Sequence, residues 1–120
     1  MRPKLVFLLE EPSAEALLNR LLPTVLPPGV SHQCVPFKGK QHLEKYMGVR
    51  IRAWREPNVH FVVLRDQDSS PYCRKVKQRL VDICANAGRP ETLVRIACRT
   101  LEAWVLGDLS ALVEASLING

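Results

Sequence analysis

The feature that most restricts the fold is a short apolar run that leads directly into two aspartates. Residues 61–64 read Phe-Val-Val-Leu, and Asp66 and Asp68 follow almost at once. An apolar run without polar alternation is typical of a parallel strand covered on both faces, so the chain needs helices on either side of its sheet. In open α/β sheets ligands bind at the carboxyl ends of the strands, and the two aspartates fall at such an end.

Three further segments have the pattern of strands, and helical stripes separate them. We predict strands over 4–9, 30–37, 59–64 and 93–97, each followed by a helix. Ser13 is the expected N-cap of the first helix and Pro23 its expected break, whereas Gly88 is expected to end the third helix. The resulting order, β-α-β-α-β-α-β-α, predicts an α/β fold: a mainly parallel four-stranded sheet with helices on both faces.

Length and composition set the class of protein. With 120 residues, 47% of them hydrophobic, residues 1–120 are expected to form a single domain with a real core. The net charge of +5 favours an anionic partner such as nucleic acid, although 6% aromatic residues argue against an extended base-stacking platform. Four cysteines without a C-x-x-C pair are expected to be reduced thiols of a cytoplasmic protein. The first strand begins too early for a signal peptide, and no run approaches the roughly 20 apolar residues of a membrane span.

Charged residues follow all four predicted strands. They are Glu10 and Glu11, then Lys38 and Lys40, then Asp66 and Asp68, then Arg99 and Glu102. Because parallel strands end at one edge of a sheet, we expect acidic and basic groups to meet there. Spacing alone leaves two interpretations of Asp66 and Asp68 equally open, as ligands of a hard cation or as a strand-end residue and a helix cap.

The basic groups at this edge are candidates for phosphate binding. Lys38 and Lys40 flank Gly39 and would act as mobile point charges, whereas Arg65 and Arg99 suit two-pronged contacts with phosphate. For any one of them a solvated surface charge is the simpler interpretation. Phosphate binding by several of them together requires that they lie at the same edge of the sheet.

The segments that carry these residues resemble a bacterial family of domains of unknown function (family 4276) with a Toprim-like fold. The similar motifs are Leu-Leu-Glu-Glu-Pro-Ser at 8–13, Phe-Lys-Gly-Lys at 37–40, Val-Val-Leu-Arg-Asp-Gln-Asp at 62–68 and Leu-Glu-Ala-Trp-Val-Leu-Gly-Asp at 101–108. The last motif is the most specific, and the resemblance covers nearly the whole chain.

The resemblance implies a metal-dependent phosphoryl-transfer module. Toprim domains of topoisomerases, primases and overcoming-lysogenization-defect nucleases carry a glutamate after the first strand and Asp-x-Asp after a later one. Glu10, Asp66 and Asp68 match these positions and are the implied catalytic residues. The same three residues with Glu102 are the implied ligands of Mg²⁺ or Mn²⁺, and Glu11 and Asp108 are secondary candidates. Glu11 stands where many Toprim sequences have glycine, and the chain is expected to lack a C-terminal extension that relatives carry.

Two functions remain open at this stage. The first is a metal-dependent nuclease acting on DNA or RNA, the effector of a phage-defence system with an ATPase partner of the AAA or ABC type. Three converging carboxylates would repel one another without a cation, which favours this interpretation. The alternative is a non-catalytic Toprim-like module that docks on such an ATPase. A phosphoacceptor receiver domain is disfavoured, because Arg99 and Glu102 stand where it would need a lysine.

Overall fold

The computed structural model describes residues 3–10, 12–66, 73–97 and 110–117. Its strands are β1 (Lys4–Leu9), β2 (Ser31–Pro36), β3 (Val59–Asp66) and β4 (Leu93–Ala97), and its helices are α1 (Pro12–Val25), α2 (Lys40–Ala53) and α3 (Cys73–Asn86). Residues 110–117 form a further helix near the end of the chain. Strands and helices alternate as the hydrophobic pattern predicts, which confirms the α/β class.

All four strands are parallel and lie in the order β2-β1-β3-β4. β1 is therefore a central strand, and its residues from Leu5 to Leu9 have no exposed surface. The strand at 59–64, whose apolar run predicted burial on both faces, is the other central strand and runs on to Asp66. β2 and β4 form the two edges.

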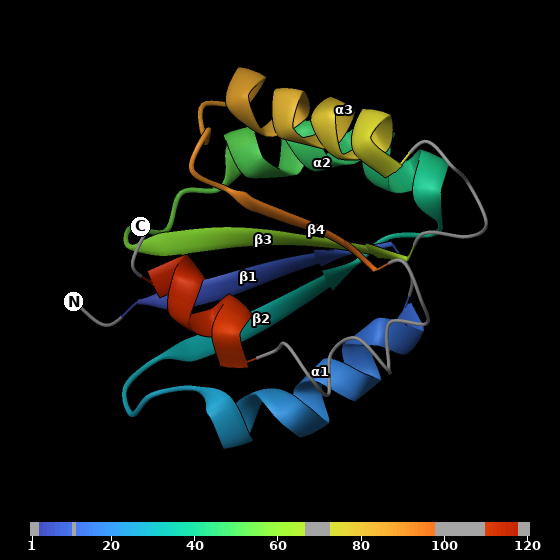
Figure 1. Cartoon of the computed structure of the whole chain (residues 1–120). Helices are drawn as coiled ribbons and strands as arrows, with labels where there is room; N and C mark the ends of the chain where they lie inside the picture. Colours follow the sequence, from blue (N-terminus) through green and yellow to red (C-terminus); the bar gives the residue numbers. More distant parts are fainter. Residues whose placement is uncertain (1–2, 11, 67–72, 98–109, 118–120) are drawn as a thin grey trace.

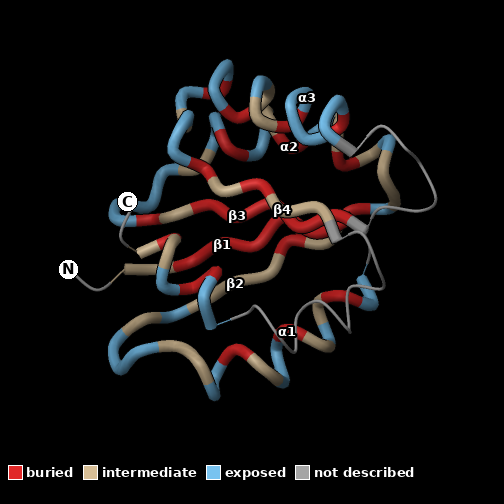
Figure 2. The backbone as a smooth tube through the Cα atoms, viewed as in Figure 1, coloured by how far each residue is buried: buried red, intermediate tan, exposed pale blue. Residues whose placement is uncertain are grey.

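Helices cover both faces of the sheet (Figure 1). α2 and α3 lie on one face, while α1 and the helix at 110–117 lie on the other. Alternate residues of the strands serve the two layers, so Leu8 and Val63 pack toward α2 and α3 whereas Leu9 and Leu64 pack toward α1. Figure 2 shows the resulting band of buried residues along the sheet.

Two predicted helix boundaries are wrong by a few residues. α1 begins at Pro12 rather than after Ser13, since proline suits the first helical position, where its missing N–H has no partner to lose. The helix also continues through Pro23 to Val25 instead of breaking there. Pro23 lies in the last turn, so it removes one helical hydrogen bond, and the amide of Leu26 still donates to the carbonyl of Leu22 at 3.0 Å.

The end of α3 is confirmed in detail. Gly88 adopts a φ of 90°, a left-handed conformation that other residues rarely adopt. The amide of Arg89 donates to the carbonyl of Cys84 at 2.9 Å, and that of Gly88 donates to Ala85 at 3.0 Å. This pair of hydrogen bonds is the Schellman motif, which ends a helix by satisfying its last carbonyls.

Candidate functional site

The carboxyl ends of β1 and β3 lie side by side, as the predicted site requires. Leu9 is level with Leu64 in the parallel register, so Glu10 follows one strand beside Arg65 and Asp66 of the other. On the far side of β3, Asp66 pairs in register with Ala97 of β4. The backbone therefore brings Glu10 and Asp66 to adjacent strand ends at one edge of the sheet.

Glu10 is buried beside a buried arginine. Its residue is only 9% exposed and Arg65 only 8%. The Glu10 carboxylate lies 3.8 Å from Arg65 Nε, and Arg65 Nη1 lies 3.1 Å from Glu44 Oε1 on α2. Arg79 Nε of α3 reaches the same Glu44 oxygen at 2.9 Å. Two carboxylates and two guanidinium groups thus alternate beneath the strand ends, and their charges balance.

Arg65 retains donor capacity in this arrangement. Its Nε and Nη1 are buried, and within the described part of the chain neither donates a hydrogen bond of good geometry. The contacts with Glu10 and Glu44 are therefore ion pairs by distance rather than directed hydrogen bonds. The predicted phosphate-binding role of Arg65 stays a prediction, and the structure adds that its guanidinium lies between two acids, Glu10 and Glu44.

The segment after β2 is fastened to the end of β1. The amide of Gly39 donates to the backbone carbonyl of Glu10 at 2.7 Å, and the amide of Phe37 donates to Leu9 at 2.8 Å. Gly39 has a φ of 115°, so a side chain here would strain the turn. Lys38 and Lys40 consequently flank a turn that touches the backbone of Glu10.

The same turn begins α2 with unusual chemistry. Gly39 is the N-cap and supplies no side-chain hydrogen bond, and the first turn holds no acidic residue. A helix N-terminus carries partial positive charge and normally favours acids, yet Lys38 and Lys40 stand there. Two lysines beside a helix N-terminus that lacks a side-chain cap place positive charge at the carboxyl edge, which suits an anion.

The remaining predicted site residues lie outside the part of the chain that the structure describes. These are the side chain of Asp66 and the whole of Glu11, Asp68, Arg99, Glu102 and Asp108. Their predicted roles stay predictions. Among residues 3–10, 12–66, 73–97 and 110–117, no three His, Cys, Asp or Glu side chains cluster so as to hold a metal ion.

Two members of the charge network were missed by reasoning from sequence. Glu44 and Arg79 come from different helices and follow no motif. A helical spacing places Glu44 one turn after Lys40, but nothing local indicates that it reaches under the sheet to Arg65. Only the packing of α2 and α3 on the same face brings these charges together.

This chain was compared with known protein families, curated sequences and solved structures. No curated protein sequence matches the chain significantly. Among solved structures, a de novo designed Rossmann fold protein is similar, with 12% identity, a TM-score of 0.47, and coverage of 88% of this chain and 95% of that chain. In the described segments, no helix is both long enough and apolar enough to cross a membrane. A family model, Domain of unknown function (DUF4276), matches residues 9–119, and the chain therefore belongs to this family.

Proposed function

We propose that this chain is a Toprim-like, divalent-metal-dependent phosphodiester hydrolase that acts on nucleic acid. One observation carries the proposal: β1 and β3 are adjacent and parallel, with Leu9 level with Leu64. Glu10 and Asp66 therefore stand at neighbouring strand ends, as the resemblance to Toprim domains requires. A different strand order would have separated the two acids.

The residues that the resemblance implies as metal ligands suit a hard divalent cation. Glu10, Asp66, Asp68 and Glu102 offer only carboxylate oxygens, which Mg²⁺ and Mn²⁺ prefer to nitrogen or sulfur. When bound, such an ion would polarise a phosphodiester and favour an attacking hydroxide. The protein residues would share the other tasks: Lys38 and Lys40 bind phosphate, Arg65 neutralises Glu10 from below, and Glu10 is the candidate general base.

A hydrolysis assay tests this proposal. The chain is incubated with labelled single- and double-stranded DNA and RNA, with Mg²⁺, Mn²⁺ or EDTA, alone and with an ATPase encoded beside its gene. We expect metal-dependent cleavage that Glu10→Gln abolishes, because the amide keeps the shape of glutamate but not its charge. Cleavage that persists in EDTA, or that survives Glu10→Gln, would contradict it.

The alternative, a non-catalytic module that docks on an AAA or ABC ATPase, is favoured by the Arg65 network. Glu10 already has a cationic neighbour at 3.8 Å, so a metal ion is not needed to balance its charge. In that case metal would leave the protein unchanged, and the isolated chain would still bind the ATPase. The phage-defence setting belongs to both proposals and is tested by the genes that flank this one.

A further inference from the structure

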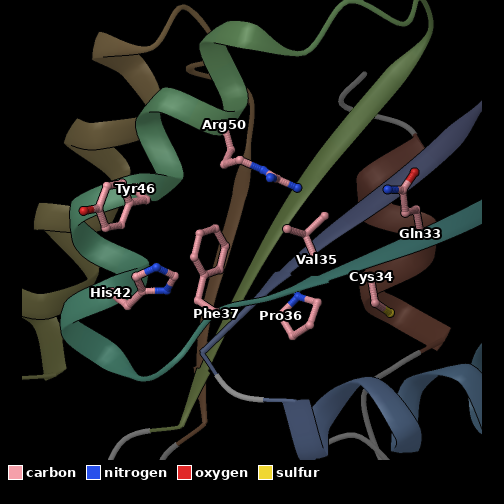
Figure 3. Close-up of a pocket in the computed structure, with 8 residues that line it drawn as sticks. All are labelled: Gln33, Cys34, Val35, Pro36, Phe37, His42, Tyr46 and Arg50. Carbon is pink, nitrogen blue, oxygen red and sulfur yellow. The ribbon is translucent and has the colours of Figure 1, made fainter.

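A groove lies beside the open edge of the sheet, between α2 and the strand β2. It has a volume of about 370 Å³ and is lined by residues 33–37 and by His42, Tyr46 and Arg50 (Figure 3). The three α2 residues are four positions apart, so they form one row along the helix. Arg50 also lines a second hollow beyond it, with Trp54 and Arg55, so the two hollows share a wall.

Three rings that meet edge-on or tilted line the groove, and one of them is exposed. The ring of His42 lies 5.4 Å from that of Phe37 and 4.9 Å from that of Tyr46. Phe37 is buried, whereas Tyr46 is 41% exposed. Lys45 Nζ lies 5.4 Å from the centre of the Tyr46 ring. Proteins that bind single strands combine exposed aromatic rings, on which bases stack, with nearby cations that pair with phosphates.

The charge of this face is positive. Among the described residues that line the groove there is no carboxylate, and Arg50 carries the formal charge. Glu44, the acid of α2, faces Arg65 and Arg79 and is neutralised there. An anionic ligand therefore meets arginine and lysine without a competing acid from the helix.

The groove is continuous with the carboxyl edge of the sheet. The amide of Lys38 donates to His42 Nδ1 at 3.0 Å. A neutral imidazole that accepts at Nδ1 carries its proton on Nε2, so His42 has a hydrogen-bond donor left to offer. The next residue, Gly39, contacts the backbone of Glu10. The row from His42 to Arg50 thus leads away from the proposed active edge for about 12 Å along the helix.

We propose that this groove binds a single strand of nucleic acid, with a base stacked on Tyr46 and a phosphate paired with Arg50. The proposal rests on the proposed function and supplies the path by which the substrate strand reaches the carboxyl edge. The low aromatic content argues against an extended platform, but one exposed ring and one arginine suffice for a site of a few nucleotides.

Strand addition by a peptide suits this edge less well. The amides of Ser31 and Phe37 bond to β1, so in the alternating parallel ladder residues 32, 34 and 36 present their backbone outward. Position 36 is proline, which has no N–H to donate to an added strand. Proline on an edge strand is a common means of preventing such pairing.

Fluorescence anisotropy with a labelled oligothymidylate of about eight nucleotides tests the groove. The titration is done in EDTA at several salt concentrations, so that it does not depend on cleavage. We expect Tyr46→Ala to weaken binding roughly tenfold and Tyr46→Phe to restore it, because stacking needs the ring. Arg50→Ala should weaken binding and lower the salt slope by about 0.7, the value for one phosphate contact on a single strand. Arg20→Ala, an equally exposed arginine on α1, is the matched control and should change affinity little.

Three outcomes would contradict the proposal that the groove binds nucleic acid. They are no binding by the unaltered protein at low salt, equal losses in Arg50→Ala and Arg20→Ala, and full affinity in Tyr46→Ala. Metal-dependent cleavage together with full affinity in Tyr46→Ala would contradict nucleic-acid binding in the groove but would support the proposed hydrolase function. Binding that needs Tyr46 and Arg50 without any cleavage would support the groove and contradict the hydrolase.

Discussion

Arg65 is the residue on which the chemistry of the strand ends depends most. It is buried between the carboxylates of Glu10 and Glu44, which would otherwise face each other in a low-dielectric setting. A buried ion pair adds little net stability compared with apolar packing, but removal of one partner leaves an uncompensated charge. The arginine therefore offsets the charges of two acids that come from different parts of the fold, the end of β1 and α2.

Replacing this arginine should cost much stability. We expect Arg65→Met to lower the free energy of unfolding by about 3 kcal/mol, because the Glu10 carboxylate loses a buried counter-charge, whereas Glu44 keeps Arg79. Urea denaturation measures the loss. Adding Glu10→Gln to this variant should recover part of it, since the carboxylate that lost this counter-charge is then removed.

Arg79→Ala is the matched control. Its side chain is 56% exposed, so its pair with Glu44 is screened by water and the loss should stay below about 1 kcal/mol. If Arg65→Met and the unaltered protein had the same free energy of unfolding, the buried ion pairs would not be required for stability.

The buried thiol of Cys84 should make the free energy of unfolding depend on pH in the alkaline range. Burial raises the pKa of its thiol from 9.0 to about 11, so the folded protein keeps the proton longer than the unfolded chain does. Stability from this group is complete below pH 9 and falls as the pH rises toward 11. The free energy of unfolding of Cys84→Ala should fall less steeply over that window than that of the unaltered protein. If the free energies of unfolding of the two proteins fell in parallel with pH, the Cys84 thiol would not be the cause of the loss.

At the residue scale, sequence patterns could predict which acids follow the strands but not what neutralises them. Glu10 stands out because it follows an apolar run, and the site prediction followed from that. Its neighbour Arg65 was predicted to bind phosphate, since spacing cannot show that its side chain turns into the layer between sheet and helices. That direction depends on Glu44 and Arg79, which α2 and α3 supply.

The contact between α2 and α3 is close at Gly48. A Cβ built at this position would lie 3.2 Å from Cγ2 of Ile83, which is closer than ordinary contact. Glycine in a helix interior costs up to about 1 kcal/mol relative to alanine, so its presence here indicates that the close approach of the two helices is worth that cost.

Gly48→Leu should therefore destabilise the protein by about 2 kcal/mol, because the larger side chain overpacks the helix pair. Gly48→Ala is the control: its gain in helix propensity offsets most of the mild clash, so its free energy of unfolding should change little. Thermal or urea unfolding compares the two. A leucine variant as stable as the alanine variant would show that α2 and α3 can separate without cost.

At the element scale, the strands were predicted well and the helix ends less well. The strands predicted at 4–9 and 93–97 coincide with β1 and β4. For β1 the reason is an apolar run that is buried on both faces of the sheet. Pro36 has no N–H for a second neighbouring strand, which suits an edge position, and β2 is an edge strand. The predicted break at Pro23 was wrong because a proline in the last turn of a helix costs a single hydrogen bond. The burial of Leu22 in the core favours continuing the helix past that point.

At the scale of the whole molecule, the sheet order decides the candidate site. Parallel strands and right-handed crossovers were predictable from the alternation of elements, but the order β2-β1-β3-β4 was not. This order places the segment after β2 and the end of β3 on either side of Glu10. The lysines at 38 and 40 and the backbone of Asp66 consequently flank it at one edge.

The central claim is that carboxylates at this edge hold a divalent cation, and the melting temperature measures it most directly. Millimolar Mn²⁺ should raise the melting temperature by several degrees, because the ion binds only the folded chain. Asp66→Ala with Asp68→Ala should remove that rise, whereas Glu91→Ala with Glu114→Ala, which removes two exposed carboxylates elsewhere, should retain it. An unchanged melting temperature in the unaltered protein, or an equal rise in both double variants, would contradict the metal site.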